Sequence, residues 1–94
     1  MEQLTIENKS FRGDCIPVQG NVNLLLIQGS KGMLGCGYVA MAAAEKFGHA
    51  LAIVGGVSTF DDMMGAKVSA VSSSAAALGV EVGMSGKEAL LKMA

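Results

Sequence analysis

The sequence predicts one α+β domain, residues 1–94, in which an aminoterminal antiparallel β-meander carries three to four helices packed on the sheet. Short apolar runs separated by turn residues fill the first third of the chain, which is typical of consecutive strands. Helix-forming runs with capping residues follow, interrupted by one further strand-like run. A length of 94 residues allows only one modest core. Strands followed by mixed elements indicate the α+β class.

Four extended segments are expected before the first helix. Leu4 and Ile6 alternate with polar residues, so both should lie on one face of the first strand. We expect a bulge at 12–14, and Pro17 should lie at a strand end or a sheet edge. In order, the segments are a strand over 3–8, a turn at 9–10, a strand over 11–19, a hairpin turn at 20–21, a central strand over 22–27, a turn at 29–32 and a strand over 33–36.

The remaining two thirds of the chain should be mainly helical. A helix-forming run ends at Gly48, a residue type that favours the position after a helix. The spacing of Val68, Val71, Ala75 and Leu78 places them on one helical face, with Gly79 ending that helix. In order, we expect a helix over 38–47, a buried strand over 49–54 that pairs with the meander, a short helix to about 64 with a break at Gly65, a helix over 68–78 and a terminal helix over 86–93.

Two helix starts carry capping residues. Ser58 and Thr59 are each followed three residues later by an aspartate, Asp61 and Asp62, which also suit the positive end of a helix dipole. Ser85 with Glu88 forms a capping box at the start of the last helix. Because adjacent helical residues point about 100° apart, the two aspartates are assigned to capping and not to a catalytic pair.

Composition and charge exclude several classes of function. Seven basic and eight acidic residues give a net charge of −1, without the basic patch that nucleic-acid binding needs. The apolar stretches are too short and too rich in glycine to cross a membrane, and the amino end does not resemble a secretory signal. Cys15 and Cys36 lack the spacing of a metal site, so reduced thiols and a cytoplasmic protein are expected.

The shortage of charge predicts self-association. Hydrophobic residues make up 51% of the chain and charged residues 16%, which is too little polar side chain to cover a small domain. The remaining apolar surface should be covered by further copies of the chain, because contiguous apolar patches are usually interaction sites. Exposed edges of the aminoterminal sheet would pair between subunits, forming a closed oligomer or, if the rotation does not close, a filament.

Three stretches carry a resemblance to a known family. They are residues 35–38 (Gly-Cys-Gly-Tyr), residues 52–62 (Ala-Ile-Val-Gly-Gly-Val-Ser-Thr-Phe-Asp-Asp) and residues 78–90, which end in Gly-Met-Ser-Gly-Lys-Glu-Ala-Leu. Together they resemble the YunC-like family of small bacterial and archaeal proteins, a domain of unknown function. The resemblance implies an α+β fold whose aminoterminal sheet mediates tetramer formation. It implies no reaction, substrate or cofactor.

Cys36 is the candidate catalytic residue. It is flanked by two glycines where a strand is expected to pass into a helix, a setting that favours a reactive thiolate. Nucleophilic catalysis also needs a base, and His49, the single histidine of the chain, is 13 residues away. The alternative is a small buried side chain that packs closely between glycines.

A second candidate site would bind an anion or another small molecule. Lys31 and the backbone amides near Gly37 suit an anion, although the chain lacks the spacing of a phosphate-binding loop. The candidate ligand-binding residues are Lys31, Gly35, Gly37 and Tyr38. No metal site is expected, and no cofactor is indicated.

Three functions therefore stay open. The first is a cytoplasmic homo-oligomer, expected to be a tetramer, that acts as an assembly or interaction protein through its aminoterminal sheet. The second is a small-molecule or thiol-based enzyme or sensor that uses Cys36. The third is an anion-binding regulatory subunit of a larger complex. The sequence does not distinguish catalysis from assembly.

Overall fold

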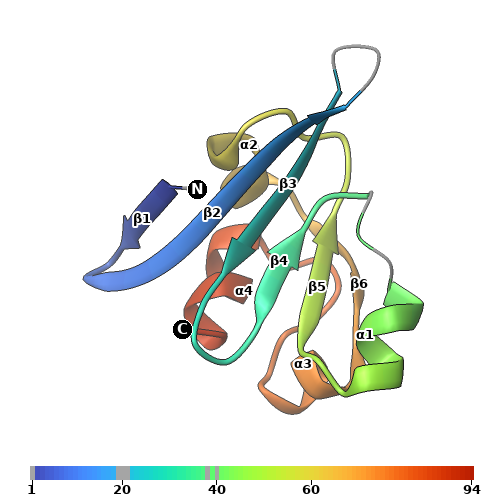
Figure 1. Ribbon diagram of the computed structural model, residues 1–94. Coiled ribbons are helices and arrows are strands. Elements are labelled where there is room, and N and C mark those ends of the chain that lie inside the picture. Colours follow the sequence, from blue (N-terminus) through green and yellow to red (C-terminus); the bar gives the residue numbers. More distant parts are fainter. Residues whose placement is uncertain (1, 19–21, 38, 40) are drawn as a thin grey trace.

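The computed structural model describes residues 2–18, 22–37, 39 and 41–94, and it has the predicted α+β fold (Figure 1). Within these residues, six strands form one sheet and four helices pack around it. The strands are β1 (Glu2–Ile6), β2 (Lys9–Val18), β3 (Val22–Gln28), β4 (Met33–Gly35), β5 (Leu51–Val54) and β6 (Val68–Val71). The helices are α1 (Met41–Phe47), α2 (Phe60–Gly65), α3 (Ser73–Ala77) and α4 (Gly86–Lys92).

The strands lie in the sheet in the order in which they occur in the sequence, from β1 to β6. The first four strands form an antiparallel meander, as predicted, with β3 in an interior position. The chain passes from β4 to β5 through α1, and these two strands are parallel. Parallel neighbours need such a crossover because a hairpin cannot join them. β5 and β6 are antiparallel again, with a register shift at Ile53 and Val54.

The core lies between one face of the sheet, here called the inner face, and helices α2, α3 and α4. Side chains that alternate along the strands point into it, and they meet apolar residues of these helices. The largest fully buried members of this core are Leu25, Ile27, Leu34, Met63, Leu90, Met93, Val54, Val68 and Val80. The alternation of Leu4 and Ile6 is confirmed, since Ile6 is buried and Leu4 packs against the core.

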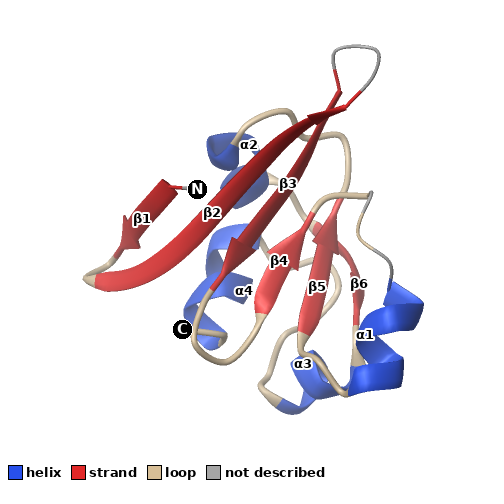
Figure 2. Cartoon of the chain, viewed as in Figure 1, coloured by secondary structure: helices blue, strands red, loops and turns tan. Residues whose placement is uncertain are grey.

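The opposite, outer face of the sheet is mostly uncovered. Leu51 is fully buried but is not a member of the core cluster, and it alternates along β5 with the core residue Ala52, so it lies on the outer face. Figure 2 shows no helix in front of β1 to β4 on this face. Leu26, Gln28 and Met33 therefore remain only half-buried there. The helices pack on the sheet as predicted, but α2, α3 and α4 cover the inner face while α1 lies on the other side (Figure 1).

The capping predictions are confirmed for Thr59 and Ser85, whereas Ser58 lies outside the cap and its backbone N–H donates to the Asp62 carboxylate at 3.0 Å. The Thr59 hydroxyl accepts a hydrogen bond from the backbone N–H of Asp62 at 3.0 Å, and Ser85 accepts one from the backbone N–H of Glu88 at 3.1 Å. The helix after Thr59 ends at Gly65, as the sequence indicated. Gly48 and Gly79 have φ angles of 70° and 92°, the left-handed conformation that favours glycine after a helix.

The prediction of a helix over 68–78 is wrong in its first half. Val68 to Val71 form strand β6, which pairs with β5, and the helix α3 starts only at Ser73. The same segment also fits a strand, because apolar Val68 and Ala70 alternate with polar Ser69. Pairing with β5 decides between them, because it buries Val68 and satisfies backbone groups of an otherwise open strand.

Three smaller predictions need correction. The first turn lies at Glu7 and Asn8 and not at residues 9–10. Both residues have positive φ angles, 48° and 68°, which is the conformation of a tight two-residue hairpin. The register of β2 is regular on both sides from Arg12 to Asp14, so the expected bulge is absent. The first helix begins at Met41, later than predicted. The hairpin turn expected at 20–21 lies outside the described residues.

Candidate functional site

Two adjoining pockets lie where the turn between β3 and β4 meets its neighbours. The first pocket has a volume of about 520 Å³ and the second about 350 Å³, both within the range of small-molecule sites. The first is lined by Glu2, Gln3, Ser10, Phe11, Arg12, Gln28, Gly29 and Ser30. The second, here called the Lys31 pocket, is lined by Gln28, Gly29, Lys31, Gly32, Met33, Gly48, His49 and Ala50. Gln28 and Gly29 belong to both.

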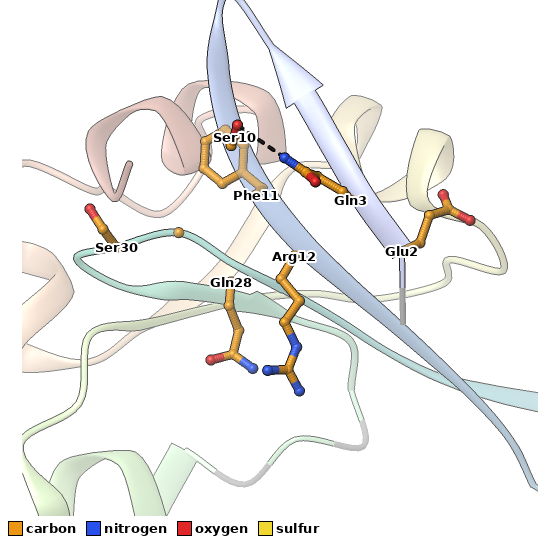
Figure 3. Close-up of a pocket in the computed structure, with 8 residues that line it drawn as sticks. Glu2, Gln3, Ser10, Phe11, Arg12, Gln28 and Ser30 are labelled. Atoms are coloured by element: carbon orange, nitrogen blue, oxygen red, sulfur yellow. Dashed lines mark hydrogen bonds between the residues drawn. The ribbon is translucent and has the colours of Figure 1, made fainter.

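The first pocket is lined mainly by polar side chains. Phe11 borders it but is 2% exposed and packs in the core, so it leaves almost no aromatic surface to a ligand. Arg12 and Gln28 are direct cross-strand partners, and Figure 3 shows their side chains projecting in the same direction. Gln3 donates a long hydrogen bond of 3.4 Å to the Ser10 hydroxyl (Figure 3). The pocket thus presents several polar side chains that can donate or accept hydrogen bonds.

The turn that carries Lys31 is fixed to the end of the chain. The backbone N–H of Lys31 donates to the carbonyl of Met93 at 2.9 Å, and the turn is closed by a bond from Gly29 to Gly32. A side chain at Gly32 would lie 2.7 Å from the sulfur of Met93, and one at Gly29 would collide with the Met93 carbonyl. The glycines expected to form a turn are therefore also needed for close packing.

His49 reaches the Lys31 pocket from the other side, between α1 and β5. Its backbone N–H donates to the carbonyl of Ala44 at 2.8 Å, and its carbonyl accepts a bond from the Ser72 hydroxyl at 2.8 Å. Its ring lies 5.9 Å from the ring of Phe47, between the centroids. The backbone of His49 is therefore held firmly while its side chain is exposed.

The structure separates the predicted ligand-binding residues. Lys31 precedes β4 and Gly37 follows it, so the two lie at opposite ends of that strand. Gly35 packs beneath Val39, where a side chain would lie 2.6 Å from a methyl group. Gly37 is exposed, and Tyr38 lies outside the described residues. Instead of Gly37, the structure brings Gln28 and His49 to Lys31.

Cys36 occupies a buried position beside β3. Its side chain is 3% exposed, and its sulfur accepts a hydrogen bond from the backbone N–H of Leu25 at 3.3 Å. The helix α1 begins five residues later, at Met41, so Cys36 is not in its first turn. His49 precedes β5 whereas Cys36 follows β4, and in a parallel pair these are opposite ends. This geometry favours a packing role for Cys36.

The donor residues Arg12 and Gln28 were missed by sequence reasoning. Their approach depends on the pairing register of β2 with β3, which no local pattern contains. The polar residue at the end of an otherwise apolar strand, Gln28, was the available signal. Among the described residues, no group of three or more His, Cys, Asp or Glu side chains forms a metal site.

Near the site, hydrogen bonds of the Glu45 carboxylate connect α1 to α3 and should make the stability of the fold depend on pH. The Ser73 backbone N–H donates to one carboxylate oxygen at 2.8 Å and the Ser73 hydroxyl to the other at 2.9 Å. These bonds, the backbone bond most, lower the pKa of Glu45 by favouring its charged form. A lowered pKa stabilises the fold above the ordinary carboxyl range, and that stabilisation is lost as pH falls through the folded-state value.

We therefore expect Glu45→Gln to lower the free energy of unfolding at neutral pH, and the difference from the unaltered protein to shrink as the pH falls from about 7 to about 3. Urea titrations at fixed protein concentration measure this difference. Glu81→Gln is the matched control, because Glu81 is exposed and its carboxylate has no partner among the described residues. A difference that stays constant over this range would contradict the role of the Ser73 bonds.

Comparisons with known proteins agree with this fold and give no activity. In the described part of the chain, no helix has both the length and the apolar character needed to cross a membrane. The chain is 33% identical to the uncharacterized protein YunC of Bacillus subtilis (strain 168), over 96% of this chain and 92% of that protein. It superposes with a TM-score of 0.92 on the crystal structure of TA1206, a protein of unknown function from Thermoplasma acidophilum, at 34% identity over 99% of this chain and 90% of that one. Residues 35–93 match the model of a domain of unknown function, DUF1805, and the chain belongs to this YunC-like family.

Proposed function

We propose that the protein is a cytoplasmic assembly subunit that forms a homotetramer through its aminoterminal sheet. The observation that carries this proposal is the free end of the β2–β3 hairpin, residues 14–18 and 22–24, here called the hairpin arm. The pairing of β1 with β2 stops at Gly13, and β4 pairs with β3 only from Leu26 onward. Figure 1 shows the arm extending beyond the neighbouring strands.

The arm is apolar and exposed on both faces. Three consecutive residues of β2, Cys15, Ile16 and Pro17, are exposed, although consecutive side chains of a strand point to opposite faces. Ile16 is 54% exposed, which is unusual for a large apolar side chain in a strand. Leu24, directly opposite Ile16, extends this apolar strip.

The arm carries little of the protection that isolated sheet edges usually have. Natural edge strands avoid pairing with other chains through charged residues, above all lysine, through proline or through bulges. Asp14 lies at the base of the arm and Pro17 within it, but no charged residue lies between Asp14 and Lys31, and the register of β2 with β3 is regular. We assign a second copy of the chain as the occupant, because an uncharged edge with apolar faces is complementary to itself.

A tetramer follows from the presence of two separate contact surfaces. The arm offers one surface, and the free edge of β1, the first strand of the sheet, offers another. Two different two-fold contacts on one subunit generate a closed tetramer when their axes intersect at a right angle, whereas one contact alone generates a dimer. The exposed thiol of Cys15 suits the reducing conditions of the cytoplasm, which is the reason for that part of the proposal.

Sedimentation velocity of two matched variants tests the proposal. Ile16→Asp places a charge in the arm and should shift the tetramer to smaller species, because burying an unpaired carboxylate costs several kcal/mol, about 3 or more at each contact. Val82→Asp introduces the same charge at a side chain that is 62% exposed, outside the sheet, and should leave the tetramer intact. A monomeric unaltered protein at micromolar concentration, or a tetramer unaffected by Ile16→Asp, would contradict the proposal.

A further inference from the structure

We propose that the Lys31 pocket binds a small molecule through a phosphate or carboxylate group. The pocket lies at the opposite end of the β2–β3 hairpin from the arm, so this inference does not depend on assembly. It rests on the charge of the pocket, on the rigid attachment of its residues and on the adjoining pocket that provides room for the rest of the ligand.

The charge of the pocket is positive in a chain whose net charge is −1. Lys31 and His49 both line it, and none of its lining residues is acidic. Among the described residues, the ion pairs are Arg12 with Asp14 and Lys87 with Glu7, so the ammonium group of Lys31 is not neutralised by a carboxylate. An oxyanion is the ligand group that such unpaired donors favour.

A further cation lies beside the pocket on α1. The ammonium group of Lys46 lies 5.6 Å from the centroid of the Phe47 ring, which in turn lies near the His49 ring. This contact holds Lys46 close to the aromatic pair. The positive charge at this end of the sheet thus comes from Lys31 on the β3–β4 turn and Lys46 on α1, and the His49 ring before β5 adds a hydrogen-bonding group.

The pocket is preorganised by backbone bonds. The main chain of Lys31 is bonded to Met93, and that of His49 is bonded to Ala44 and to the Ser72 hydroxyl. Both residues thus have fixed backbones and exposed side chains. Binding an anion then requires ordering only two side chains, which lowers its entropic cost.

The adjoining pocket would hold the remainder of the ligand. It shares Gln28 and Gly29 with the Lys31 pocket and is the larger of the two. Gln3, Ser10 and Ser30 offer polar groups there, and Arg12 offers donors beside its ion pair with Asp14. A ligand with one anionic end and a compact polar body therefore matches the two pockets together.

The test is an NMR titration of the backbone amides with inorganic phosphate and, separately, with citrate. Sodium chloride at matched ionic strength serves as the control for screening. We expect at least one probe to give saturable shifts confined to residues 28–33 and 48–50. Saturation by phosphate alone or by citrate alone would identify the preferred group. Shifts that are absent for both probes, or that resemble those of chloride, would overturn the proposal.

Matched variants then assign the binding to this pocket. Lys31→Gln and His49→Ala should each weaken binding and raise the dissociation constant at least about tenfold. Lys67→Gln removes the same charge at an exposed lysine that lines neither pocket, and it should bind like the unaltered protein. Amide spectra without probe confirm that each variant is folded. If Lys67→Gln weakened binding as much as Lys31→Gln, or if Lys31→Gln left it unchanged, the assignment would be wrong.

Discussion

Replacement of Gly86 by alanine is expected to destabilise the protein by about 3 kcal/mol or more, since overpacking a site that cannot relax exceeds the usual range. Gly86 is the first residue of α4 and is completely enclosed by its surroundings. A side chain there would collide with the backbone carbonyl of Met63 and lie 3.0 Å from a methyl group of Leu34. The backbone N–H of Gly86 also donates to the carbonyl of Ala66 at 2.8 Å, which prevents α4 from moving away.

Gly65→Ala provides the matched control for this prediction. Gly65 is the last residue of α2, and a side chain added there would meet nothing within 4 Å. Alanine should therefore leave stability unchanged or raise it by about 0.5 to 1 kcal/mol. Urea unfolding followed by circular dichroism, at one protein concentration, compares the two variants. Equal stabilities of Gly86→Ala and Gly65→Ala would contradict the close contact of α4 with α2.

Ser72→Ala is expected to cost about 2 to 4 kcal/mol, because it leaves two buried N–H groups without their partner. The Ser72 hydroxyl is fully buried and uses all of its hydrogen-bonding capacity. It accepts bonds from the N–H groups of Leu51 at 2.8 Å and Ala75 at 3.2 Å, and it donates to the carbonyl of His49 at 2.8 Å. One side chain thus connects the start of β5 to the start of α3.

Ser69→Ala is the control for Ser72. Ser69 is exposed, and its hydroxyl makes one hydrogen bond, to the carbonyl of Ile53 at 3.1 Å. Its replacement should cost about 1 kcal/mol or less, since water replaces a lost bond at the surface. Thermal unfolding at equal protein concentration gives both values. A loss for Ser72→Ala no greater than that for Ser69→Ala would show that water reaches the Leu51 N–H group.

The sequence predicted most of the sheet and the starts of α2 and α4 because these depend on neighbouring residues. The Ser85 and Glu88 capping box and the Thr59 cap need only a few consecutive residues to form. The alternation of Leu4 with Ile6 requires a single buried face, which the structure provides. Predictions of this kind succeed where local preference and tertiary packing agree.

The strand β6 could not be predicted with the same certainty because its pattern fits two structures. Val68 to Val71 can lie on a helix or alternate in a strand, and only the partner β5 selects the strand. Ser72 shows the same limit. The predicted helix over 68–78 contains this residue, whereas in the structure it caps α3 from a fully buried position.

The pockets depend on tertiary structure still more. Lys31 was singled out from the sequence, but its predicted neighbour Gly37 lies at the other end of β4. Its observed neighbours, Gln28 and His49, come from β3 and from the segment before β5. The parallel pairing of β4 with β5 places His49 beside Lys31, and that pairing follows from the α1 crossover alone.

Concentration-dependent hydrogen exchange of the unaltered protein tests the central claim most directly, because it reports assembly and its location together. Backbone N–H groups on the free edges of the arm, within residues 14–18 and 22–24, should exchange slowly at high protein concentration. On dilution below the dissociation constant of the tetramer, their exchange should accelerate while that of the buried strand β5 stays slow. Fast exchange of the arm at every concentration would contradict assembly through the aminoterminal sheet.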